Sequence, residues 1–422
     1  MLFKKLCFFK FGPIYFLKCC LFSVMSMVTK DTIKLALIFA CIALHCIDGV
    51  GVFYSNAFDE KTLALSQSSS NFLALRDYIP FLARIAGGYC LGKLADKIGF
   101  FKTMEIICLV PVITGCAILF FESPAIFENT ILRSIGYWIL KFIRWSSLIL
   151  PLIYIFQHTE KSKHWKYSAI AFSTFVLGML INNRLFIVYK SADSFNLFLI
   201  NILCGLLSLI IYFYLNTMPK IKLENIKKNQ ILKQARSFAF LLAGTVGACL
   251  SYQFYFVEQY FSTVMIIETA GQYIAYSPFW ITLFLTILPL AKITRTLDLA
   301  KILKISLTGI ILSAVLLHIT PLYNEHILFI HQIMYALSFG LFLGPALRFI
   351  YQLLQINHSY FLTNFIFGFG FSFFSMASSL IAKTKFLPAP LLGLVLIIAV
   401  MSLCLWMLSY FKFSKENEEY KC

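Results

Sequence analysis

Charged residues are scarce in this sequence. Asp, Glu, Lys and Arg make up only 13% of its 422 residues, whereas 60% are hydrophobic and 17% aromatic. A soluble domain carries about 25% charged residues, and a soluble core has no room for this much apolar surface. The composition, with a mean hydropathy of +0.81, therefore predicts an all-α polytopic membrane protein.

Acidic residues are the scarcer of the two signs, with 19 Asp and Glu against 36 Lys and Arg, which gives a net charge of +17. In a soluble protein this excess would suggest a nucleic-acid partner. In a membrane protein it is typical of loops on the cytoplasmic side. We therefore expect no nucleic-acid partner.

Motifs of catalytic or metal chemistry are also missing. The sequence contains no HExxH, Gly-x-Ser-x-Gly, phosphate-binding loop, CxxC pair or Cys/His cluster. Most of the twelve cysteines lie in apolar runs, where they are typical of small buried hydrophobic residues. We expect neither an enzyme nor a cofactor or metal site, and the lack of a filter-like segment disfavours a channel.

Apolar runs long enough to span a bilayer, which takes about 20 residues, follow one another almost to the end of the chain. Twelve spans are predicted, at 32–54, 71–94, 101–121, 129–156, 167–189, 194–218, 237–261, 271–293, 302–319, 326–354, 360–382 and 388–411. They divide the chain into an extension that is cytoplasmic or interfacial (1–30), a six-helix half (31–218), a basic cytoplasmic linker (219–236), a second six-helix half (237–411) and a cytoplasmic tail (412–422).

Loop charges and a weak internal repeat support this division. Lys and Arg gather in the central linker and in every second loop, which places both termini in the cytoplasm. Gly92–Asp96, after the second span, resembles Ala291–Arg295, after the eighth, at an offset of 291 − 92 = 199 residues. We therefore expect two halves related by an axis along the membrane normal.

A charged stretch, GGYCLGKLADKIGFFK, separates the second and third spans. Gly88 and Gly92 are four residues apart on one helix face, which lets a neighbouring helix approach closely. Asp96 is unexpected among lysines. It either caps a helix N-terminus or pairs with a cation, or it merely offsets the positive charge of a solvated loop.

The other residues of this stretch suit a cytoplasmic interface. Lys97 and Lys102 carry positive charge there, and Gly99 permits a tight turn into the third span. The spacing Gly92-x-x-x-Asp96-Lys97-x-Gly99-x-x-Lys102 resembles the signature loop of the major facilitator superfamily. That resemblance implies that Gly88, Gly92, Asp96, Lys97, Gly99 and Lys102 form a gating motif.

The wider stretch 83–103 resembles the metabolite:proton symporter family, which carries proline/betaine, 2-oxoglutarate, citrate and shikimate. GLFLGPALRF (340–349) and 364–384 are similar to that family's tenth and eleventh helices, and Asp48 stands where its first helix has an acid. The region 142–161 departs from the family, because it has no Gly and no Glu before Glu160. This departure puts the family's proton-coupling arrangement in question.

Ionisable side chains within the spans are functional candidates, because they are costly to bury in a membrane. The spans contain Asp48, Arg84, Arg144, Glu258, His331 and Arg348. We assign substrate contact and proton coupling to Asp48, Arg84 and Arg144, and a possible cavity to His331, Gly344, Pro345 and Arg348. These residues also have structural alternatives. Asp48 and Arg84 would form ion pairs that fix helix packing, and Glu258 would be solvated. His331 would be a hydrogen-bonded core histidine, and Arg348 would extend to the cytoplasmic interface.

The resemblance implies a proton-coupled secondary transporter of the inner (plasma) membrane, a monomer in the lipid bilayer. Its expected substrate is a small carboxylate-bearing metabolite, either an organic acid or a zwitterionic osmolyte of the proline/betaine type. The alternative is a sensor or scaffold that binds a ligand without transporting it.

Overall fold

The computed structural model describes residues 30–47, 70–121, 130–189, 194–218, 233–253, 270–319, 325–354, 359–382 and 389–419. All regular secondary structure in these segments is helical, which confirms the all-α fold. Asp48, Glu258 and the extension up to residue 29 lie outside the described segments.

The helices follow the predicted spans closely. Those of the first half are α3 (Lys30–Cys46), α5 (Ser70–Ile98), α6 (Phe100–Phe121), α7 (Thr130–Arg144), α8 (Ser146–Gln157), the short η1 (Lys161–Lys163), α9 (His164–Tyr189) and α10 (Ser194–Thr217). Those of the second half are α11 (Lys233–Ser251), α13 (Ala270–Thr294), α14 (Leu299–Ile319), α15 (Glu325–Leu354), α16 (Tyr360–Ala382) and α17 (Ala389–Glu419).

Membrane character is clear in the described helices. Seven stretches are long and apolar enough to cross a bilayer, and two further apolar helices, Ala235–Ser251 and Pro278–Thr294, are shorter. Many of their outward side chains are large and apolar, such as Ile113, Ile210 and Leu285, each 63–64% exposed. Side chains of this kind belong in lipid, and the chain is a multi-pass membrane protein.

The fourth predicted span holds a membrane span at Trp138–Gln157, but its helix is interrupted. It is divided at Trp145 into α7 and α8. The hydroxyl of Ser147 donates to the Arg144 carbonyl oxygen at 2.8 Å, and it thereby competes with the backbone at the break. Pro151 in α8 removes one more backbone donor.

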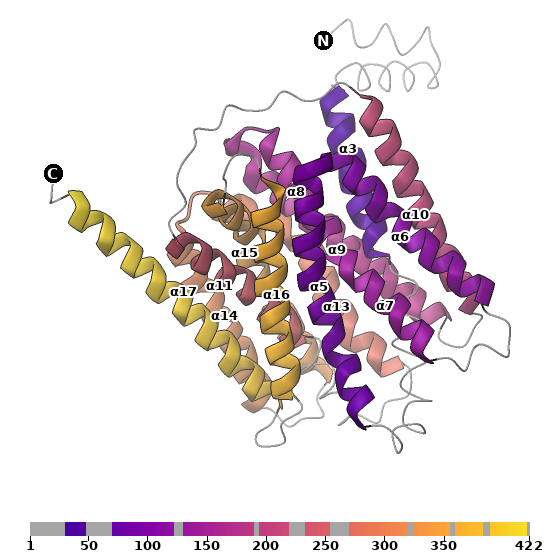
Figure 1. Cartoon of the computed structure of the whole chain (residues 1–422). Coiled ribbons are helices and arrows are strands. Elements are labelled where there is room, and N and C mark those ends of the chain that lie inside the picture. The colour runs from indigo at the N-terminus through magenta and orange to yellow at the C-terminus, as the bar shows by residue number, and fades with distance from the viewer. Residues whose placement is uncertain are drawn as a thin grey trace, which may run out of the picture.

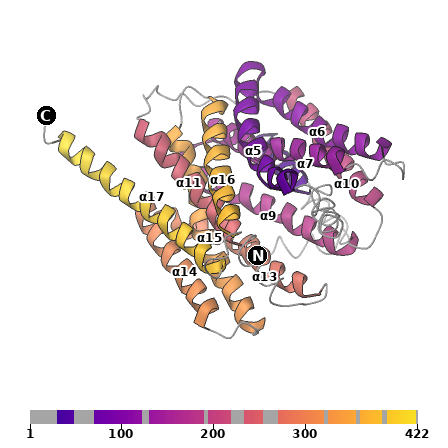
Figure 2. The same ribbon diagram turned by 60° about the horizontal axis from the view of Figure 1, so that its bottom comes forward.

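The last helix also differs from the prediction, since α17 continues beyond the expected end of the span at Phe411 to Glu419. Figure 2 shows the helices up to α10 gathered on one side of the molecule and those from α11 onward on the other. Four helix pairs join the halves, α5 and α8 with α16, and α9 with α13 and α15. Figure 1 shows α5 and α16 running side by side.

Candidate functional site

The end of the molecule at which α5 finishes and α16 begins is held together by Asp96; we call it the Asp96 end. One carboxylate oxygen of Asp96 accepts hydrogen bonds from the Ser359 hydroxyl at 2.7 Å and the Phe361 amide at 3.3 Å. The other oxygen accepts from the Tyr360 amide at 2.6 Å. Asp96 therefore caps the N-terminus of α16, where an anion also meets the positive end of the helix dipole.

Two glycines of the same motif let α5 and α16 approach closely. A Cβ atom at Gly92 would lie 2.8 Å from the Cα of Phe361, and one at Gly88 would lie 3.2 Å from the carbonyl oxygen of Asn364. The close neighbour expected from the spacing of the glycines is therefore α16, from the opposite half.

A buried amide completes this seam, and we did not predict it. Asn364 is 1% exposed, and its Nδ2 donates to the Gly88 carbonyl at 2.9 Å and to the Ser146 hydroxyl at 3.0 Å. Asn364 thus ties α16 to both α5 and α8. The only sequence signal was one amide at the start of the apolar run NFIFGFGF, with nothing to indicate its partners.

The remaining residues of the predicted motif lie at the surface. Lys97 and Lys102 are exposed, and Gly99 adopts a φ of +90° between α5 and α6, a conformation that favours glycine. Lys93 contacts the Tyr89 hydroxyl and lies 5.5 Å from the ring centroid of Phe361 in α16.

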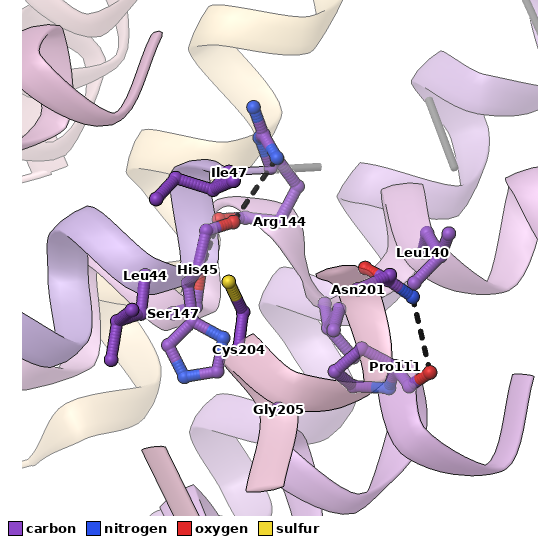
Figure 3. A pocket seen from close by; sticks show the side chains of 11 residues that line it. Leu44, His45, Ile47, Pro111, Leu140, Arg144, Ser147, Asn201, Cys204 and Gly205 are labelled. Carbon is purple, nitrogen blue, oxygen red and sulfur yellow. Dashed lines mark hydrogen bonds between the residues drawn. The ribbon is translucent and has the colours of Figure 1, made fainter. Parts of the chain in front are cut away.

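Arg144 lies at the break in the fourth span and holds the end of α3 (Figure 3). Its guanidinium donates to the carbonyl oxygens of His45 at 3.1 Å and Cys46 at 3.3 Å. The last carbonyls of a helix have no partner within it, so a cation there both satisfies and stabilises them. This contact is structural.

The small pocket beside Arg144 has polar and apolar walls, and its polar side chains include His45 and Asn201 (Figure 3). Its volume is about 20 Å³, close to the space that one water requires. The pocket in this conformation is too small for a metabolite.

Arg84 lies on the face of α5 that meets α16. It is half-buried, its Cζ lies 5.4 Å from the ring centroid of Phe81, and its carbonyl oxygen is 3.5 Å from where a Cβ of Gly368 would be. The backbone of Arg84 therefore lies at the seam between the halves, and its guanidinium lies beside Phe81 on the same helix.

The four residues assigned to a possible cavity contact different helices. Nδ1 of buried His331 is 2.7 Å from the Ser313 carbonyl oxygen in α14, whereas the Gly344 carbonyl accepts from the Ser168 hydroxyl in α9 at 2.6 Å. Pro345 is buried within α15, and the Arg348 guanidinium lies 4.6 Å from the Phe349 ring. His331 and Gly344 are about 20 Å apart along α15, too far for one small site.

No protein-family profile matches the sequence, and no curated protein matches it either. Several solved structures are similar to this chain. The human organic anion transporter MFSD10 is similar over 90% of this chain and 100% of its own, with 12% identity and a TM-score of 0.67. The proton:xylose symporter XylE matches 90% of this chain and 95% of its own, again with 12% identity and a TM-score of 0.67.

The fucose:proton symporter FucP of E. coli is similar over 89% of this chain and 98% of its own, with 12% identity and a TM-score of 0.61. The chain has the major facilitator fold. Within this fold, the Asp96 contact joins the second span to the eleventh. At this level of identity the likeness concerns the fold and leaves the metabolite:proton symporter subfamily open.

Proposed function

We propose that the protein is a secondary active transporter that works by alternating access. The observation that carries this proposal is the seam at the Asp96 end. A single carboxylate from one half caps a helix of the other, and glycines allow the two backbones to touch. Such a contact stabilises a conformation closed at this end without a covalent bond, and it is lost when the halves rock apart.

For the substrate, we propose a small carboxylate-bearing metabolite moved together with protons. Arg84 is the cation we assign to the carboxylate, because it lies at the seam and a guanidinium binds carboxylates in a bidentate fashion. Arg144 is a weaker candidate, since the carbonyl groups at the end of α3 already accept hydrogen bonds from it. Asp48 is the proposed proton site.

The solved structures that share the fold lend support to this proposal. Two are named as proton symporters, for xylose and fucose, and one as an organic anion transporter. We propose, as for the metabolite:proton symporter family that the sequence resembles, a monomer in the inner (plasma) membrane with both termini in the cytoplasm.

The test is uptake into liposomes that contain the purified full-length chain. Labelled proline, betaine, 2-oxoglutarate and citrate are supplied with and without an inward proton gradient. We expect one compound to accumulate against its gradient and a protonophore to abolish the accumulation. Equilibration that ignores the proton gradient would contradict proton coupling, and no movement of any carboxylate would contradict the proposed substrate class.

A ligand-binding protein that does not transport is the second candidate. It is favoured by one observation, the divergent fourth span, in which α8 is buried along its whole length and follows a break at Trp145. This candidate predicts saturable binding of a compound in detergent and no movement of that compound into liposomes.

A further inference from the structure

Five buried polar residues lie at one level of the second half, on α15 and in the turn that follows α11. We call this set the Gln332 layer, and it consists of Tyr252, Gln253, His331, Gln332 and Tyr335. Gln332 is 0% exposed, and neither its amide oxygen nor its amide nitrogen makes a hydrogen bond with the described part of the chain. Gln253 is 1% exposed, and its amide oxygen also makes none there.

Ring contacts place the two glutamines at one level of the bundle. The ring of Tyr252 in the last described turn after α11 lies 5.1 Å from that of Tyr335 and 6.3 Å from that of His331. Gln253 and Gln332 directly follow Tyr252 and His331 in the chain, so their backbones lie at the same level of the bundle.

Two other polar atoms of the layer have partners within the protein. The Tyr335 hydroxyl donates to the Cys249 carbonyl at 2.7 Å, and His331 Nδ1 lies 2.7 Å from the Ser313 carbonyl oxygen. Buried polar groups almost always have partners, and a Gln332 amide has two donor hydrogens and two acceptor lone pairs to satisfy. A leucine of similar size would fill this space without that need. Within the described part of the chain these amides are therefore available to a bonding partner that the described residues do not supply.

We propose that Gln332, together with Gln253, binds the uncharged, hydroxyl-bearing part of the transported solute. An amide presents a donor and an acceptor side by side, which matches a hydroxyl group because a hydroxyl also does both. The five residues of the layer include no Asp, Glu, Lys or Arg, so a charged group here would lack a counter-charge from them.

This inference rests on the proposed function and narrows its substrate class. A trimethylammonium group offers neither donor nor acceptor to an amide, which disfavours a betaine-type osmolyte. A hydroxylated organic acid has both ends that the chain can recognise, a carboxylate for Arg84 and hydroxyl groups for the Gln332 layer. Gln332 is fully buried here, so the solute reaches it only when the surrounding helices move, as alternating access requires.

The test compares Gln332→Leu with wild-type protein in detergent, using isothermal titration with four probes. These are D-gluconate (hydroxyls and a carboxylate), succinate (carboxylates alone), sorbitol (hydroxyls alone) and glycine betaine. We expect D-gluconate to bind the wild type and to bind Gln332→Leu at least tenfold more weakly, with less than a twofold change for succinate. Gln352→Leu is the matched control, because Gln352 lies on the same helix but is exposed.

Thermal unfolding gives a second readout, independent of the probes. If the Gln332 amide awaits an outside partner, the melting temperature of unliganded Gln332→Leu stays equal to that of the wild type or rises. A fall of several degrees would overturn the proposal, because the amide would then be bonded within the protein. Lack of D-gluconate binding to the wild type, or equal binding to both proteins, would overturn it too.

Two outcomes separate this inference from the proposed function. Sorbitol binding that equals D-gluconate binding and depends on Gln332 would support the hydroxyl site while contradicting the carboxylate substrate. D-gluconate that binds through Gln332 but never enters liposomes would support the site while contradicting transport.

Discussion

Asp96 shows how one side chain can bias the conformation of a whole membrane protein. Its carboxylate bonds two backbone amides and a hydroxyl at the start of α16, and the helix dipole adds to these bonds. A cap of this kind contributes about 1–2 kcal/mol, which corresponds to about 5- to 30-fold in the ratio of two conformations. In the proposed transport cycle, these bonds are lost when the Asp96 end opens.

Asp96→Ala should therefore slow transport while leaving substrate binding largely intact. We expect initial uptake into liposomes to fall about tenfold, because the closed conformation loses its cap, and the equilibrium affinity in detergent to change by less than about threefold. Asp298→Ala is the control, since the Asp298 carboxylate caps α14 within one half, where it accepts from the Lys301 amide at 2.7 Å. Unchanged uptake in Asp96→Ala would rule out the gating role.

Gly92 sets the distance between the two backbones at the same end. Its absent Cβ would lie 2.8 Å from a backbone atom of α16, which cannot move aside as a flexible side chain could. We expect Gly92→Val to destabilise the closed seam. Position 364, where Asn364 is 1% exposed in the closed seam, should then become accessible to a thiol reagent. The measurement is thiol labelling of Asn364→Cys in a cysteine-free background, with and without Gly92→Val. Equal labelling would contradict this role of Gly92.

At the scale of helices, the end of α3 depends on a side chain from another span. Arg144 supplies two hydrogen bonds to carbonyls of α3 that otherwise lack partners within that helix, and its nitrogen also lies 3.3 Å from the Met179 sulfur. We therefore expect Arg144→Gln to lower the free energy of unfolding by about 2–3 kcal/mol, a typical value for hydrogen bonds to a charged group.

Thermal unfolding in detergent measures this effect, and Arg144→Lys provides the comparison. Lysine keeps the charge but cannot reach two carbonyls with a planar fork, so it should recover only part of the loss. If both variants melt like the wild type while uptake falls, Arg144 acts on the substrate and our structural assignment is wrong.

The helices themselves could be predicted from the sequence, because a bilayer demands long apolar runs and these are visible without any tertiary information. The break at Trp145 could not. The hydrogen bond of Ser147 and the contact of Arg144 with α3 accompany the break and have no signature in an apolar run, although Pro151 in α8 is visible in the sequence. The glycine pair predicted that another helix lies close to α5, but it did not identify that helix. The partner amide, Asn364, lies 276 residues from Gly88, so no local pattern links the two.

At the scale of the whole molecule, the two halves are joined by two seams that correspond in sequence. Asp96 aligns with Arg295 at the offset of 199 residues. Asp96 caps α16, while Arg295 lies 5.9 Å from the ring centroid of Trp165 at the start of α9. Equivalent loops thus contact the opposite half in both repeats, through a carboxylate cap in one and a cation–π contact in the other.

If the halves rock as rigid units, both seams must open in every transport cycle. Cysteine pairs Tyr89→Cys/Phe361→Cys and Trp165→Cys/Arg295→Cys, each in a background without native cysteines, allow a short bifunctional thiol reagent to bridge one seam at a time. The rings of Tyr89 and Phe361 are 5.2 Å apart, so the first pair lies within reach of such a reagent. We expect bridging either seam through a reducible linker to stop uptake, and reduction to restore it.

A cysteine pair within one half is the control, because it separates the effect of bridging a seam from general damage by the bridging reagent. Phe100 and Tyr154 both belong to the first half and stack at 4.4 Å, so a bridge between cysteines at these positions should leave uptake unchanged. Loss of uptake in this control would mean that the bridged halves deform internally and do not move as units. Uptake that persists with either seam bridged would contradict rocking of the halves, because alternating access about a central site requires the closed end to open.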